Sequence, residues 1–235
     1  MGKCTMNISE FEKPITVNIL GNFSLAYDGE ILLEDQGRSH KVWNLLAYLI
    51  VNRDKHFAPS ELMEVLCSDE GIANPANAVK NLVYRLRCSL TDSKMPSLNY
   101  VVQRGGIYSW NTDIPVEVDA DIFVEKWKSA SKFKTTNDEA LSLYLEAIEL
   151  YNGRFLPRLE YEEWTVSLSV YYHTVFIECV KQVFRILSEK EDYLSIIAIC
   201  EKAIELDPYD EDIYIIYMIR VSKAPKYIQI RTLIT

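Results

Sequence analysis

The sequence predicts an α+β N-terminal part followed by an all-α part. Up to about residue 114, the patterns are those of two strands, three helices and two further strands. From Asp119 onward, apolar residues recur at helical spacing almost throughout. The 235 residues are 49% hydrophobic and 25% charged, which is an ordinary globular composition with enough chain for two domains. We place the boundary near Ile114-Pro115, which gives domains over 15–114 and 115–235.

The first domain begins with two predicted strands. Side chains over residues 15–27 alternate in character, and several are β-branched. This pattern favours one strand with a bend or bulge at Gly21-Asn22. Asp28-Gly29 is a strong hairpin turn signal, and it precedes a second strand over 30–34.

Three helices and a hairpin follow. Apolar periodicity and proline starts predict helices over about 38–52, 59–67 and 74–90. Short strands over 99–103 and 107–111 flank a glycine turn, Arg104-Gly105-Gly106. Three helices closed by a hairpin is the order of a winged helix-turn-helix.

The second domain is predicted to be helical throughout. Start and stop signals delimit helices at about 119–133, 137–151, 160–189, 192–206 and 210–221. Two of them carry small residues at helix-pairing positions and resemble the second helix of tetratricopeptide repeats. We therefore expect a tetratricopeptide-like repeat domain, with an incomplete repeat at its C-terminal end.

The third helix of the first domain is the strongest functional candidate. Its apolar residues form one inward stripe, which leaves five polar side chains facing outward and Arg87 at the flank. The outward residues are Asn77, Lys80, Asn81, Tyr84 and Arg85. Arg reads guanine edges, Asn reads adenine edges, and Lys or Tyr reaches phosphates, so this face suits a major-groove reader. A solvated amphipathic helix is the alternative.

Three further cations complete the predicted DNA-binding set. Arg104 lies at the hairpin tip, where a wing would meet the backbone or minor groove. Arg38 and Lys41 lie near the start of the first long helix and could meet phosphate there. Ordinary surface positions remain the alternative for all three.

The overall charge argues against a wholly basic DNA binder. The formal net charge is −9, but residues 1–114 carry 11 Lys+Arg against 13 Asp+Glu, while residues 115–235 carry 14 against 21. The acidity is therefore concentrated in the helical domain. DNA binding needs a local basic face rather than a basic chain.

Other functional classes lack their signatures. The sequence has no phosphate-binding, hydrolase or metalloprotease motif, and its five cysteines and three histidines show no metal-ligand spacing. We expect no enzymatic activity, no cofactor and no metal. Scattered cysteines suit a reducing compartment, and no window is apolar enough to span a membrane, so we expect a cytoplasmic protein.

The motifs of the chain resemble SARP-type transcriptional activators, in which an OmpR/PhoB-type winged helix precedes a bacterial transcriptional activation domain. The matching pieces in the first domain are Leu20-Gly21-x-Phe23, Leu45-Leu46-Ala47-Tyr48-Leu49, Glu61-Leu62, Asn81-Leu82-x2-Arg85-Leu86-Arg87-x2-Leu90 and Gly105-Gly106-Ile107-Tyr108. Those in the second are Asp119-x3-Phe123, Asn152-Gly153-x-Phe155-Leu156-Pro157, Trp164 and Asp207-Pro208-Tyr209-x-Glu211.

The resemblance implies a sequence-specific regulator, an activator, that binds double-stranded DNA. It also implies contact with RNA polymerase and dimerisation on DNA. Two alternatives stay open. The chain could be a protein-interaction scaffold whose winged helix does not bind DNA, a reading that its acidic balance favours. Its aromatic-rich helical domain could instead sense a peptide or small effector.

Overall fold

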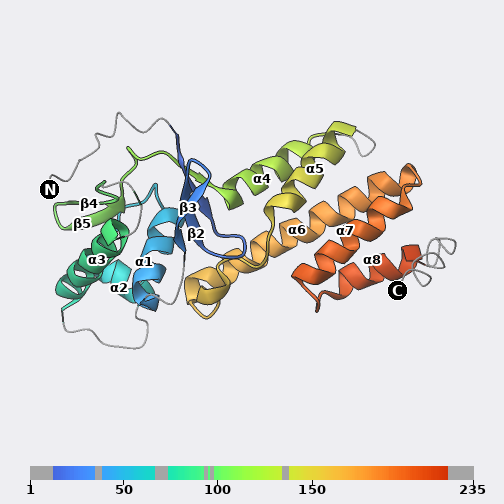
Figure 1. The fold of residues 1–235 in the computed structure, drawn as a ribbon. Helices are drawn as coiled ribbons and strands as arrows, with labels where there is room; N and C mark the ends of the chain where they lie inside the picture. Colours follow the sequence, from blue (N-terminus) through green and yellow to red (C-terminus); the bar gives the residue numbers. More distant parts are fainter. Residues whose placement is uncertain are drawn as a thin grey trace. The chain divides into compact units, whose positions relative to one another are not determined.

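The structure is a computed structural model, and it describes residues 13–34, 39–66, 74–92, 95, 98–133 and 138–221. The contacts divide the chain into two compact units (Figure 1). The first unit contains Met1–Val118 and Arg158–Val166, and the second contains Asp119–Pro157 and Ser167–Thr235. The segment 158–166 therefore groups with the first unit, although the sequence suggested no such association.

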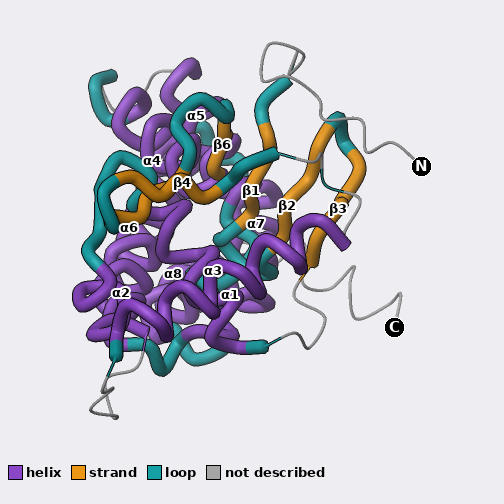
Figure 2. Tube along the Cα trace, turned by 90° about the vertical axis from the view of Figure 1, so that its left-hand side faces the viewer, coloured by secondary structure: helices purple, strands orange, loops and turns teal. Residues whose placement is uncertain are grey.

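A four-stranded sheet forms one side of the first unit. Its strands are β1 (Ile15–Asn18), β2 (Ser24–Tyr27), β3 (Glu30–Glu34) and β6 (Val116–Val118). The order across the sheet is β3-β2-β1-β6, and Figure 2 shows these strands side by side. Neighbours β1, β2 and β3 are antiparallel, whereas β6 runs parallel to β1.

The expectation of one strand over 15–27 is wrong. The chain reverses between β1 and β2, so that Thr16 lies opposite Ala26. Gly21 takes a φ of 104°, a left-handed value that favours glycine, and it lies inside this reversal. The strand β6 was not predicted, because three residues carry too little pattern to show a strand.

The described part of the first unit also contains three helices before the hairpin. They are α1 (His40–Val51), α2 (Pro59–Leu66) and α3 (Pro75–Asp92), close to the predicted ranges. Eight of the twelve residues of α1 are buried, and the helix packs against both α2 and α3. Phe23, between β1 and β2, meets Trp43 of α1 edge to face at 4.9 Å. These contacts make α1 the centre of the core.

A separate hairpin, β4 (Val101–Arg104) and β5 (Ile107–Trp110), closes the helical group. In Figure 1 the hairpin and α3 lie on the other side of α1 from the four-stranded sheet. Phe57, just before α2, pairs with Tyr108 through two backbone hydrogen bonds of 2.8 and 2.9 Å. The element order therefore contains the predicted sequence of three helices followed by a hairpin.

The second unit is built from helices. They are α4 (Asp119–Ala130), α5 (Asp138–Leu150), α6 (Glu163–Glu189), α7 (Tyr193–Leu206) and α8 (Glu211–Val221), with a 3₁₀ turn η2 (Pro157–Leu159) before α6. The helix α5 packs on α4, and α8 packs on α7. The first turn of α6 belongs to the first unit, and its remaining residues belong to the second.

The core of the second unit contains many of the aromatic side chains seen in the sequence. Tyr151 stacks on Phe176 with ring centroids 4.2 Å apart, and Phe155 lies 5.2 Å from Tyr172. All four are buried. The expected incomplete C-terminal repeat falls on residues 222–235, which lie outside the described residues. Within the described part, no helix has the length and apolar character needed to cross a membrane.

Candidate nucleic-acid interface

The inner face of helix α3 is apolar and buried. Val79, Leu82, Val83, Leu86 and Leu90 are all buried, as the apolar spacing predicts. These residues repeat at three- and four-residue intervals, so they lie on one side of the helix and fix which side faces outward.

Local interactions set where α3 begins. The Asn74 side chain accepts a hydrogen bond from the Asn77 backbone N–H at 3.0 Å, and Pro75 occupies the first helical position. Asn74 thereby caps the helix. The first residue of the outward face, Asn77, is held in a regular turn.

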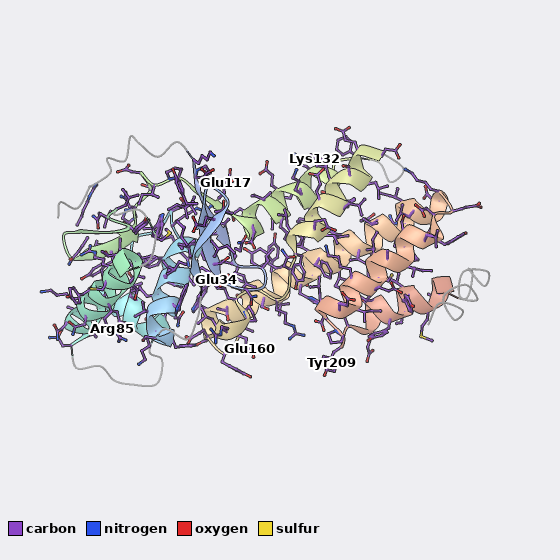
Figure 3. The ribbon with its side chains drawn as sticks, viewed as in Figure 1. Glu34, Arg85, Glu117, Lys132, Glu160 and Tyr209 are labelled. Carbon is purple, nitrogen blue, oxygen red and sulfur yellow. The ribbon has the colours of Figure 1, made fainter. Side chains whose placement is uncertain are left out.

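The outward face of α3 is exposed and free of carboxylates. Asn77, Lys80, Asn81, Tyr84 and Arg85 are all exposed, and Tyr84 retains 67% of its accessible surface. Figure 3 labels Arg85 on this helix. From residue 74 to residue 90 the sequence has three cations and no acidic residue. The structure thus brings these five predicted residues together on one helix.

The Tyr84 hydroxyl remains protonated under ordinary conditions. A hydrogen bond with the Cys88 thiol, one turn along the helix, raises the pKa of Tyr84 above its usual value. A phenol has one proton to donate, so a hydrogen bond from Tyr84 to a phosphate oxygen would replace the one to Cys88.

The hairpin presents Arg104 beside a tight two-residue turn. Gly105 and Gly106 take φ values of 58° and 84°, and the flanking residues Arg104 and Ile107 pair across the strands. Two successive positive φ values are what a type I′ hairpin turn requires. Arg104 is exposed at this end of the hairpin.

The remaining predicted cations differ in their surroundings. Arg87 is tied to the hairpin, because its Nη2 donates to the Val101 carbonyl oxygen at 2.7 Å. Lys41 is exposed in the first turn of α1, on a different helix from the main face. Arg38 lies outside the described residues.

Sequence reasoning missed a hydrogen bond between two distant side chains of the first unit. The Trp164 indole N–H donates to the Asn44 side-chain oxygen at 2.9 Å, and the same indole meets the Tyr48 ring edge to face at 5.2 Å. Asn44 is fully buried in the middle of α1. Trp164 appeared among the matching motifs, but nothing in the sequence indicated its partner, which lies 120 residues earlier.

The second unit contains a polar cluster around Asp207, just before α8. Arg154 donates to the Asp207 carboxylate at 2.9 Å, and His173 lies 2.9 Å from the Asp210 carboxylate. Burial raises the pKa of Asp207, but the hydrogen bond and positive charge of Arg154, with the Tyr209 backbone N–H, outweigh it and leave the pKa below its usual value. The cluster ties the turn before α8 to the segment after α5.

The second unit also has a hollow of about 350 Å³ between α4, α5 and α6. Trp127, Phe133 and Tyr144 supply aromatic walls, and Arg185 and Glu178 supply charge. No group of histidine, cysteine and acidic residues suited to a metal occurs among the residues that the structure describes.

A comparison with known protein families gives a match to the helical region. Residues 118–222 match the bacterial transcriptional activator domain family. No curated protein gives a significant sequence match.

Among solved structures, EmbR from Mycobacterium tuberculosis, in a complex with a low-affinity phosphopeptide, is similar to this chain. The TM-score is 0.67 with 16% identity, over 89% of this chain. The chain spans 55% of the length of that EmbR chain. At this identity the likeness concerns the fold. Together, the domain match and the shared fold support the resemblance to SARP-type transcriptional regulators.

Proposed function

We propose that this chain is a sequence-specific DNA-binding transcriptional regulator, acting as an activator. Residues 15–114 would bind DNA, and residues 115–235 would carry regulation, contact with RNA polymerase and dimerisation. The observation that carries the proposal is the outward face of α3: exposed Asn, Lys, Tyr and Arg side chains over a fully buried apolar stripe. The match of residues 118–222 to the bacterial transcriptional activator domain family supports this role.

In this mechanism α3 enters the major groove as a winged helix-turn-helix reader. Arg85 and the two asparagines, Asn77 and Asn81, have the donor and acceptor groups that distinguish base edges, and Lys80 can neutralise a phosphate. Arg104 on the hairpin would contact the adjacent backbone or minor groove. Lys41, in the first turn of α1, is a further candidate for phosphate contact.

The acidic net charge of the chain determines how tightly we expect it to bind DNA without sequence preference. Each phosphate that a cation neutralises contributes to a salt-dependent affinity, and this face offers few cations. We therefore expect weak non-specific binding, so that specificity depends on base contacts and on a second copy of the chain at a repeated half-site.

The test is fluorescence anisotropy on duplexes from the promoter region of its own gene neighbourhood, against random duplexes, between about 50 and 200 mM salt. Arg85→Ala is expected to weaken specific binding by about 1–3 kcal/mol. Lys13→Gln is the matched control, because it removes one exposed cation near the sheet, where Lys13 pairs with Asp28. Absence of any preference for promoter duplexes in the wild-type chain would refute the proposal.

A second candidate function is effector binding by the helical unit, and the hollow between α4, α5 and α6 favours it. Its aromatic walls and Arg185 suit a ligand with a flat apolar body and an anionic group. Anilinonaphthalene sulfonate is a probe of that chemistry. Arg185→Gln should weaken binding of the probe, whereas Lys181→Gln, on the same helix and paired with Asp212, should not. Equal binding by both variants would exclude this site.

A further inference from the structure

We propose that Arg87 is a positioning residue, which sets the β4–β5 hairpin against α3 and acts on DNA only through Arg104. The inference deepens the proposed function and rests on it. It also separates Arg87 from its neighbour Arg85, with which the sequence pattern had grouped it.

The first observation is the bond that Arg87 makes. Its Nη2 donates to the backbone oxygen of Val101 at 2.7 Å, a short distance typical of a charged donor. Val101 is the first residue of β4, and its side chain is completely buried. The guanidinium therefore joins α3 to the base of the hairpin rather than to its tip.

The second observation is the direction in which Arg87 points. Successive residues of an α-helix are rotated by about 100°, so residues two apart point to nearly opposite sides. Arg85 and Arg87 thus lie on opposite flanks of α3. The bond from Arg87 to Val101 places the hairpin on the flank of Arg87, away from Arg85.

The third observation is how the hairpin is held elsewhere. Its base is closed by Asn111, whose backbone N–H donates to the Tyr100 oxygen at 2.9 Å, and whose side chain donates to the Asn99 oxygen at 3.0 Å. Phe57 pairs with Tyr108 on β5. These contacts shape the hairpin and tie it to the segment before α2, whereas Arg87 ties its other strand directly to α3.

The consequence concerns the spacing between two DNA contacts. Arg104 lies three residues beyond Val101, about 10 Å along an extended strand. A fixed hairpin presents Arg104 and the outward face of α3 at one constant separation. Loss of the Arg87 bond lets that separation vary, so binding must then order the hairpin as well, which lowers affinity.

The test is a double-mutant cycle on promoter duplexes with the full chain, using Arg87→Ala, Arg104→Ala and the double variant. We expect Arg87→Ala to weaken binding by about tenfold, the effect of losing one charged hydrogen bond. In the Arg104→Ala background, Arg87→Ala should have little further effect, because the contact it positions is gone. A loss that persists undiminished in that background means that Arg87 touches DNA itself, and it overturns the inference.

Two further measurements keep the outcome interpretable. Arg87→Lys keeps the charge and one donor, and it should restore part of the lost affinity. Without DNA, amide hydrogen exchange over 101–104 should be faster in Arg87→Ala than in the wild-type chain. Unchanged exchange overturns the inference even if the wild-type chain binds no DNA, whereas absence of wild-type binding together with faster exchange refutes only the proposed function.

Discussion

The buried hydrogen bond between Trp164 and Asn44 provides a direct test of how the first unit is held together. Asn44 is completely buried in α1, and its side-chain oxygen accepts the indole N–H at 2.9 Å. Its side-chain nitrogen has no partner among the described residues. Trp164→Phe keeps an aromatic ring beside Tyr48 but leaves the whole amide of Asn44 without a partner.

We expect Trp164→Phe to lower the free energy of unfolding by about 1–3 kcal/mol, the cost of leaving a buried polar group unsatisfied. For a chain of this length, each kcal/mol lowers Tm by about 2–4 °C. Urea denaturation followed by circular dichroism measures the change.

The double variant Trp164→Phe with Asn44→Leu is the control. Replacing both partners by apolar groups removes the unsatisfied amide, so the double variant should be more stable than Trp164→Phe alone. The reasoning fails if the single variant lies within about 0.5 kcal/mol of wild type, the range of ordinary surface substitutions. It also fails if the second substitution recovers nothing.

Three other outcomes follow from the geometry. Gly106→Val should destabilise the first unit by about 1–2 kcal/mol because of its φ of 84°, whereas Gly105→Asn should be tolerated in thermal melts, since asparagine suits this turn position. Asp207→Asn should reduce the loss of stability on acidification. Because the pKa of Asp207 is lowered in the folded protein, its carboxylate stabilises the fold above the unfolded-state pKa, and this stabilisation disappears as pH falls through the folded-state pKa. Urea titrations at several pH values measure the difference. Lys80→Ala should reduce the salt slope of DNA binding by about one, whereas an unchanged slope would remove Lys80 from the phosphate contacts.

The helices were predictable because their signals are local. The start of α3 is encoded by Asn74 and Pro75, and its inward face by apolar residues spaced within a few turns. The same holds for the exposed face that we propose as the reader. A helix determines which residues share a side from spacing alone, so five site residues fell together without knowledge of the tertiary fold.

The strands were less predictable because their pairing is not local. The segment 15–27 has one alternating pattern, but the structure folds it into two antiparallel strands. Val116–Val118 becomes a strand only because β1, about 100 residues earlier, offers it a parallel partner. Short strands carry little intrinsic preference, and their context decides whether they pair.

The sequence by itself determined the order of the helices, the inner and outer faces of α3 and the change from an α+β part to a helical part. Only the tertiary structure decided that Arg87 bonds to Val101 and that Trp164 bonds to Asn44 in the first unit. The physical reason is that helical periodicity is a property of neighbouring residues. A hydrogen bond between distant residues depends instead on where folding places them, and no spacing within the chain encodes that placement.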